Sequence, residues 1–146
     1  MPLVYFDSSA FVKLLIAEEG SRRAAELWDG CDAALSSRLA YPEVRAALAA
    51  AGRNHEITRA EVARACASWE EFWAATRPVE LTPGVERLAG ELASDHGLRG
   101  AVAVHLASAA IAADEDLVVA AWDRRLRAGV VAEGLLVAPL HLADPS

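Results

Sequence analysis

The sequence has little lysine, few cysteines and no long apolar segment. Lysine occurs once, at Lys13, the other 13 of the 14 basic residues are arginine, and the formal net charge is −7. Strong sequence-independent binding of nucleic acid depends on many Lys and Arg contacts with phosphate groups. The acidic balance therefore excludes a broad basic surface for nucleic acid, although it leaves open a local acidic site that cations bridge to phosphate.

The two cysteines, Cys31 and Cys66, stand alone in the sequence. They form none of the spacings typical of metal sites, and we expect buried, unreactive thiols. No apolar run approaches the roughly 20 residues of a membrane span, so we expect no membrane partner. The first residues lack a basic segment and carry Asp7 early, which argues against a signal peptide and favours a cytoplasmic protein.

Hydrophobic side chains are abundant, at 54% of 146 residues, and many of them are alanine. This apolar content excludes a disordered chain and favours helices with small, closely packed faces. The length fits one domain, and no repeat, low-complexity tract or long linker divides it. We therefore expect a single domain over residues 1–146.

Short β-rich segments alternate with helical segments along the chain. Strands are predicted over 3–6, 33–36, 79–81, 117–120 and 135–137, with helices over 10–15, 20–28, 41–51, 58–75, 82–97 and 101–113 and a short helix from 123. Strands that alternate with helices predict an α/β fold in which helices flank a small parallel sheet on both faces.

Local signals set several of these boundaries. Thr58 and Glu61 have the spacing of a capping box at the start of a helix. Ser8 or Ser9 is placed to cap the first helix, because a hydroxyl there accepts hydrogen bonds from unpaired backbone N–H groups. Residues 29–30, Asp-Gly, are typical of a turn.

Three carboxylates occupy comparable places in the predicted sheet. Asp7 directly follows the first strand, Asp123 follows the strand over 117–120, and Glu43 lies in the first turn of the helix after the strand over 33–36. Each of them alone is typical of a helix start, where Asp7 would be a simple cap. Ligands bind at the carboxyl ends of parallel strands, where all three can converge.

Convergence of these carboxylates favours a site for a hard cation. Two carboxylates about 4 Å apart repel by about 4 kcal/mol at an effective dielectric near 20, so clustering requires a cation, a shared proton or water. Oxygen ligands are those that Mg²⁺ and Mn²⁺ prefer. The sequence therefore predicts a divalent-metal site at this sheet edge.

Four segments together resemble a known family. They are residues 4–13, 36–47, 98–109 and 119–126, and they stand in order and at similar spacing to motifs of PIN-domain proteins, particularly the VapC-type toxins of bacterial toxin–antitoxin systems. Each segment alone is weakly specific, whereas four in register are a strong indication. The resemblance implies a single PIN-like domain with a parallel sheet between helices.

The resemblance also implies an activity, which is that of a metal-dependent endoribonuclease. It implies that Asp7, Glu43 and Asp123 bind Mg²⁺ or Mn²⁺, directly or through water, and that Ser9 supports Asp7. The ion would activate water against an RNA phosphodiester. Implied partners are an RNA substrate, a cognate VapB-type antitoxin and a second copy of the chain in a homodimer.

The sequence departs from the family pattern at two positions. Val102 stands where the family usually has an aspartate, and Ala121 stands where it usually has Thr or Ser. Valine cannot bind a cation, so we predict that this chain binds metal poorly and cleaves RNA feebly or not at all. Either an engineered inactivation or a natural, weakened homologue would account for Val102.

Basic residues lie near the predicted site. Arg99, Arg124 and Arg125 are candidates for RNA-phosphate contacts, although a solvated surface or pairing with Asp123 accounts for them equally well. His105 follows Val102 by three residues and shares its helix face. A hydrogen-bonded packing histidine is favoured over a metal ligand at that position.

The aromatic residues Trp69, Phe72 and Trp73 have helical spacing. This pattern is typical of a core-facing stripe, and a dimer contact or a groove for an antitoxin helix is the alternative. Asp114 and Asp116 precede a strand, at the opposite edge of the sheet from the predicted site, and we expect a solvated turn.

Two other functions remain open from the sequence. One is a catalytically inactive binding module that keeps the fold and the antitoxin contacts, which Val102 and Ala121 favour. The other is a phosphatase of the haloacid dehalogenase kind with Asp7 as nucleophile. That enzyme would require a second aspartate at position 9, where this chain has Ser9.

Overall fold

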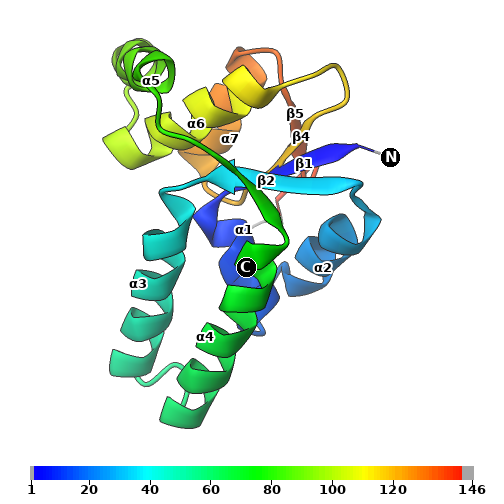
Figure 1. Ribbon diagram of the computed structural model, residues 1–146, viewed down its shortest axis with the longest axis vertical. Coiled ribbons are helices and arrows are strands. Elements are labelled where there is room, and N and C mark those ends of the chain that lie inside the picture. The colour runs from blue at the N-terminus through cyan, green and yellow to red at the C-terminus, as the bar shows by residue number, and fades with distance from the viewer. Residues whose placement is uncertain (1, 143–146) are drawn as a thin grey trace.

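A five-stranded, fully parallel sheet runs through the centre of the protein (Figure 1). The computed structural model describes residues 2–142, so residues 1 and 143–146 of the predicted domain lie outside the described part. The strand order is β3-β2-β1-β4-β5. The strands are β1 (Leu3–Phe6), β2 (Ala33–Ser37), β3 (Thr76–Val79), β4 (Val118–Ala120) and β5 (Leu136–Ala138).

Helices cover both faces of this sheet (Figure 1). One face carries α1 (Ser8–Leu15), α2 (Ser21–Gly30), α3 (Ala40–Arg53) and α4 (Arg59–Ala74); the other carries α5 (Pro83–His96), α6 (Gly100–Ala112) and α7 (Arg124–Ala132). The predicted α/β fold with a parallel sheet between helices is confirmed.

The central strand β1 explains why there are two hydrophobic cores. Successive side chains of a strand point to opposite faces. Tyr5 accordingly packs with α5, α6 and α7, whereas Val4 and Phe6 pack with α1 to α4. All three side chains are at most 1% exposed. Because β1 is buried on both faces, it is an almost continuous apolar run in the sequence.

The predicted aromatic stripe of α4 lies against the hydrophobic core that β1 forms with α1 to α4. Trp69 is fully buried, and Phe72 and Trp73 are partly buried beside it. Its ring contacts include the Phe11 ring at a centroid distance of 4.7 Å. The core-facing interpretation of the stripe is confirmed for Trp69, while Phe72 also reaches the surface.

Most helix boundaries follow the sequence signals. The capping box of Thr58 and Glu61 is present with both reciprocal hydrogen bonds. Helix α5 begins at Pro83 and ends at Gly97, whose left-handed φ of 63° is favourable for glycine. Asp116 N donates to Asp114 Oδ1 in an exposed turn, as expected.

Several local predictions were wrong. Residues 29–30 lie in the last turn of α2 and do not form a turn of their own. The third strand covers Thr76–Val79 and not 79–81, because pairing with β2 fixes its position. It contains Pro78, which is tolerated since β3 is an edge strand. Cys31 and Cys66 are free thiols but only partly buried.

The parallel arrangement places the carboxyl ends of β1, β2 and β4 at one edge. β1 lies between β2 and β4, with Tyr5 in register with Leu35 and Val119. β1 ends directly before Asp7, and β2 ends shortly before α3, which carries Glu43. β4 ends shortly before Asp123. No helix in the described part of the chain is long and apolar enough to span a membrane.

Candidate functional site

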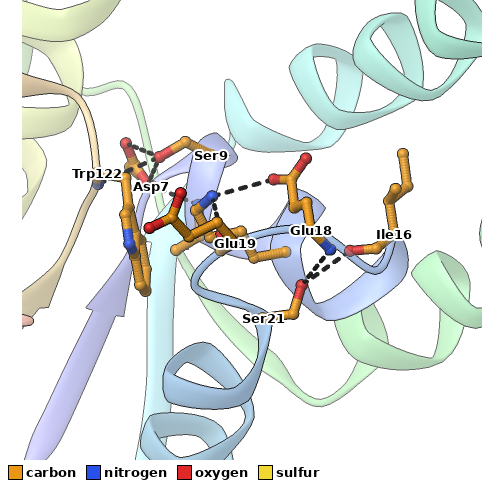
Figure 2. Close-up of polar contacts among 9 residues, drawn as sticks. Asp7, Ser9, Ile16, Glu18, Glu19, Ser21 and Trp122 are labelled. Carbon is orange, nitrogen blue, oxygen red and sulfur yellow. Dashed lines mark hydrogen bonds and ion pairs between the residues drawn. The ribbon is translucent and has the colours of Figure 1, made fainter. Parts of the chain in front are cut away.

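Asp7 connects β1 to α1 and is the N-cap of that helix. Its Oδ1 accepts a hydrogen bond from the Ala10 backbone N–H at 2.9 Å. The Ser9 hydroxyl lies 2.7 and 2.9 Å from the two carboxylate oxygens of Asp7 (Figure 2). Capping by Ser8 or Ser9 was therefore predicted wrongly, because Asp7 itself caps and Ser9 orients it from inside the helix.

Asp7 is an energetically unfavourable place for a charge. Its side chain is buried, with the residue only 4% exposed. Burial raises the pKa of the Asp7 carboxyl above its ordinary value, the nearby His105 opposes this rise, and the charge of Asp123 adds to it. The Asp7 carboxyl therefore responds to the charges of both His105 and Asp123.

Asp123 is the N-cap of α7, at the carboxyl end of β4. Its Oδ1 accepts from the Leu126 backbone N–H at 2.8 Å, and the residue is exposed. The Trp122 backbone N–H, directly before it, reaches the Ser9 hydroxyl at 3.5 Å (Figure 2). Ser9 thus links the end of β4 to Asp7.

Glu43 lies in the first turn of α3 and is held by His105 of α6. His105 Nε2 is 2.6 Å from Glu43 Oε1, and His105 Nδ1 is 2.7 Å from the Tyr5 hydroxyl. The histidine is 3% exposed. The expectation of a hydrogen-bonded packing histidine is confirmed, and its partner is one of the predicted site residues.

The structure brings the predicted residues to one edge without assembling a closed metal cage. Within residues 2–142, no three His, Cys, Asp or Glu side chains are grouped so as to hold a metal ion. Asp123 lies near Asp7, whereas Glu43 is turned to His105. The role of Asp7, Glu43 and Asp123 as metal ligands stays a prediction.

The donor chemistry nevertheless fits a divalent cation. Mg²⁺ is usually bound by one or two carboxylates, with water and substrate phosphate completing its coordination. A cation at Asp7 and Asp123 would offset both the burial and the mutual repulsion that disfavour ionised Asp7. Positive charge beside these two carboxylates would therefore be stabilising.

Val102 lies in the first turn of α6, on the side of His105. It is partly buried and packs against the core formed with α5, α6 and α7. Arg99 precedes this helix as N-cap but makes no side-chain cap, and the first turn contains no acidic residue. An aspartate at position 102 would place a negative charge in the first turn of α6, where the helix dipole stabilises it. Ala121 is fully buried in the same core.

The candidate phosphate-binding arginines are all exposed. Arg99 lies at the start of α6, and Arg124 and Arg125 begin α7. Arg127, one turn later, instead donates to the carbonyl oxygens of Ala121 and Leu140 at 2.9 and 3.3 Å. Arg124 is exposed and stays a candidate for RNA contact.

A cavity of about 400 Å³ lies beside this edge, lined among others by Lys13, Gly20, Trp122 and Arg124. The Lys13 ammonium lies 5.3 Å from the centre of the Trp122 ring. Gly20 has a φ of 90°, and a Cβ there would approach Trp122 Nε1 to 2.8 Å. Two cationic residues and an aromatic ring thus stand next to the predicted site.

Sequence reasoning missed Tyr5 as a site residue. It looks like any apolar residue of β1, yet its hydroxyl contacts His105 and accepts from the Ser37 backbone N–H at 3.0 Å. Burial raises the pKa of its phenol far above the ordinary value, so the group keeps its proton. The available signal was a tyrosine in a strand buried on both faces, since a buried phenol needs a partner.

Comparison with known proteins agrees with these features. The PIN domain family model matches residues 4–129. Ribonuclease VapC49 of Mycobacterium tuberculosis is 69% identical over 145 residues, covering 99% of this chain and 100% of that protein.

Two solved structures share the fold. FitAcB from Neisseria gonorrhoeae matches with a TM-score of 0.70 and 18% identity, over 95% of this chain and 99% of that one. A toxin–antitoxin complex from Klebsiella pneumoniae matches with a TM-score of 0.65 and 16% identity, over 96% and 99%. The match to the family model and the full-length identity to VapC49 establish that the chain belongs to the PIN-domain family, among the VapC toxins.

Proposed function

We propose that this chain is a divalent-metal-dependent endoribonuclease toxin whose catalysis is impaired by Val102. The observation that carries the proposal is the buried Asp7 carboxylate at the end of β1, with Asp123 near enough to raise its pKa further. Two carboxylates in this arrangement favour a cation between them. The 69% identity to VapC49, which is named a ribonuclease, supports RNA as the substrate.

The residues of the site would have different roles in metal binding. Bound Mg²⁺ or Mn²⁺ would lower the pKa of a coordinated water and neutralise phosphate charge. Asp7 and Asp123 would hold the ion, and Ser9 fixes the direction of Asp7 through its hydroxyl. Glu43 would bind through water or directly, with Oε1 already directed by His105.

Val102 would account for weak catalysis. His105 on the same face of α6 approaches both Glu43 and Asp7, so a carboxylate at position 102 would lie on the helix face directed to this edge. The valine instead packs its methyl groups against the core. We infer that the site retains its other residues but lacks one acidic ligand.

An RNA strand would bind along the cavity beside Asp7. Arg124 offers positive charge there and Trp122 offers a ring for base stacking, whereas the Lys13 ammonium is paired with Glu18 at 3.1 Å and would have to exchange that partner for a phosphate. Arg99 at the start of α6 and Arg125 at the start of α7 are further candidates for phosphate contacts, and Arg125 lines a separate cavity with His96 and Leu98. This local set of cations is compatible with a net charge of −7, because the contacts are confined to one edge.

A VapB-type antitoxin would bind a second, apolar groove, between α1, α2 and Phe72 of α4. A cavity of about 440 Å³ is lined there by residues that include Leu14, Ile16, Trp28 and Phe72. Such a groove suits the apolar face of an amphipathic helix. The toxin–antitoxin complex from Klebsiella pneumoniae, which shares the fold, supports an antitoxin partner. A homodimer is expected from the resemblance.

The test compares RNA cleavage by the unaltered chain and by the Val102→Asp variant in Mg²⁺, with EDTA as the metal-free control. We expect cleavage that EDTA abolishes and that Val102→Asp raises by about 100-fold, equivalent to about 2.7 kcal/mol of transition-state stabilisation. Asp7→Asn in the Val102→Asp background should abolish it. Equal cleavage by both chains would refute the impairment, and cleavage unaffected by EDTA would refute metal dependence.

If neither chain cleaves RNA, the catalytically inactive binding module becomes the better description. Retained binding of a VapB-type antitoxin would then be its positive evidence. Val102 and Ala121 are the residues that favour this second function, since neither can contribute a polar group to the site.

A further inference from the structure

A chain of buried hydrogen bonds ends at Glu43. The Ser37 backbone N–H donates to the Tyr5 hydroxyl at 3.0 Å, this hydroxyl lies 2.7 Å from His105 Nδ1, and His105 Nε2 lies 2.6 Å from Glu43 Oε1. The four residues belong to β2, β1, α6 and α3. The chain thus joins the two faces of the sheet at its carboxyl edge.

For a neutral His105 beside an ionised Glu43, the donors of this chain have one consistent order, whereas a protonated ring would donate from both nitrogens. The Tyr5 oxygen already accepts from Ser37, and its single hydrogen is then free to point to His105 Nδ1. With Nδ1 as acceptor, the proton of the ring is on Nε2, which donates to Glu43.

The hydrogen bond occupies one oxygen of Glu43 and leaves the other available. Oε1 accepts from His105, and Oε2 has no hydrogen bond to residues 2–142. The His105 side chain is 4% exposed, whereas that of Glu43 is 27% exposed. The carboxylate is therefore fixed from the protein interior, and its second oxygen can meet a ligand at the open edge.

We propose that Tyr5 and His105 are positioning residues that hold Glu43 in the direction required by the metal site. The proposal rests on the proposed function, because Glu43 needs a fixed direction only if it binds the ion or its water. Groups behind a metal ligand typically change metal affinity or activity by 10- to 100-fold when removed. Tyr5 acts at two steps from Glu43 and touches no substrate.

The first test examines the ring of His105 in the metal-free protein. ¹⁵N-detected NMR of the imidazoles should show one tautomer for His105, with the proton on Nε2. Tyr5→Phe removes the donor to Nδ1 and keeps the aromatic volume, so the Nδ1 resonance should shift, while the hydrogen bond to Glu43 keeps the proton on Nε2. A His105 ring that Tyr5→Phe leaves unchanged would overturn the proposal.

The second test measures function in the Val102→Asp background, where the metal site is complete. Mn²⁺ affinity is measured by electron paramagnetic resonance, and RNA cleavage gives kcat and KM separately. We expect Tyr5→Phe to weaken Mn²⁺ binding and lower kcat by about 10-fold, with KM within about twofold. His105→Gln, whose amide can donate to Glu43, should retain more activity than His105→Leu.

Two matched controls separate positioning from general packing. Tyr41→Phe removes the other tyrosine hydroxyl, which donates to Glu70 on the surface, and His96→Gln alters the other histidine–glutamate pair. Both should leave Mn²⁺ affinity unchanged. If Val102→Asp itself neither binds Mn²⁺ nor cleaves RNA, the proposed function fails. If it does both and Tyr5→Phe leaves both within twofold, only the positioning role fails.

Discussion

Residues 2–142 contain two histidine–glutamate pairs of the same chemistry in different surroundings. His105 Nε2 lies 2.6 Å from Glu43, and His96 Nε2 lies 2.9 Å from Glu133. The side chain of His105 is 4% exposed and that of His96 is 25% exposed. His105 also contacts Tyr5 through its second nitrogen. The residue types alone thus do not distinguish a surface contact from part of a site.

Burial and direction account for the difference between the pairs. An exposed pair is weakened by water and by mobility of its side chains, and it contributes about 0 to 1 kcal/mol. In the other pair the histidine is buried, although Glu43 is 27% exposed, and it belongs to a network through Tyr5, so its geometry is held more tightly. We therefore expect changes to the buried pair to affect function and stability, and changes to the exposed pair to affect neither.

The largest difference is expected for the two glutamates. In the Val102→Asp background, Glu43→Gln should lower kcat for RNA cleavage by about 100-fold, because an amide cannot supply the negative charge expected at the metal site. Glu133 is the C-cap of α7, away from Asp123 at the other end of that helix. Glu133→Gln should leave kcat within twofold. Equal effects of the two substitutions would show that the buried pair has no special role.

The histidines should differ in stability. His105→Leu leaves the Tyr5 hydroxyl and the Glu43 carboxylate without their partner, so we expect a loss of about 2 to 3 kcal/mol in the free energy of unfolding, measured in urea. His96→Leu should change it by less than about 0.5 kcal/mol. A loss of similar size at His96 would mean that the exposed pair is as strongly held.

The buried surroundings of His105 include Asp7, which leads to a pH prediction. The raised pKa means that folded Asp7 holds its proton more tightly than the unfolded chain does, so its ionisation lowers stability as pH rises. Asp7→Asn should stabilise the metal-free protein at pH 7 by about 1 kcal/mol, or roughly 3 °C in thermal midpoint. The gain should shrink towards about pH 4.

The control for this pH effect is Asp95→Asn, beside the exposed pair. Asp95 is exposed, and as a surface substitution Asp95→Asn should change the free energy of unfolding by less than about 0.5 kcal/mol. Adding Mn²⁺ in the Val102→Asp background should reverse the order for Asp7, since the aspartate then binds the ion and the asparagine does not. A gain at Asp7 that is independent of pH would contradict the assignment of burial as its cause.

The sequence was sufficient to predict that acidic residues lie at the carboxyl ends of the strands. It did not predict the hydrogen bond between Tyr5 and His105 behind them. Asp7, Glu43 and Asp123 could be placed because strand ends and helix starts have local signals, such as the run of apolar residues before Asp7. Contacts between Tyr5 and His105 could not, since these residues are 100 positions apart and meet only after the sheet and α6 have packed.

The wrong boundary of β3 has the same kind of cause. Residues 79–81 are locally as apolar as a strand, but the partner strand β2 pairs with residues 76–79. Thr76 is buried by that pairing, while Leu81 is 58% exposed. The position of β3 is set by its pairing with β2. Local strand propensity carries no information about that pairing.

The smallest predicted effect is the coupling within the exposed pair itself. A double-mutant cycle with His96→Leu and Glu133→Ala should give a coupling of at most about 0.5 kcal/mol, and 0.5 M salt should reduce it further. The same cycle with His105→Leu and Glu43→Ala, which removes both hydrogen-bonding groups, should give about 1 to 3 kcal/mol and depend less on salt, since the histidine is buried. Similar coupling energies with similar salt dependence would mean that burial does not separate the two pairs, and the positioning of Glu43 by His105 would then lose its energetic basis.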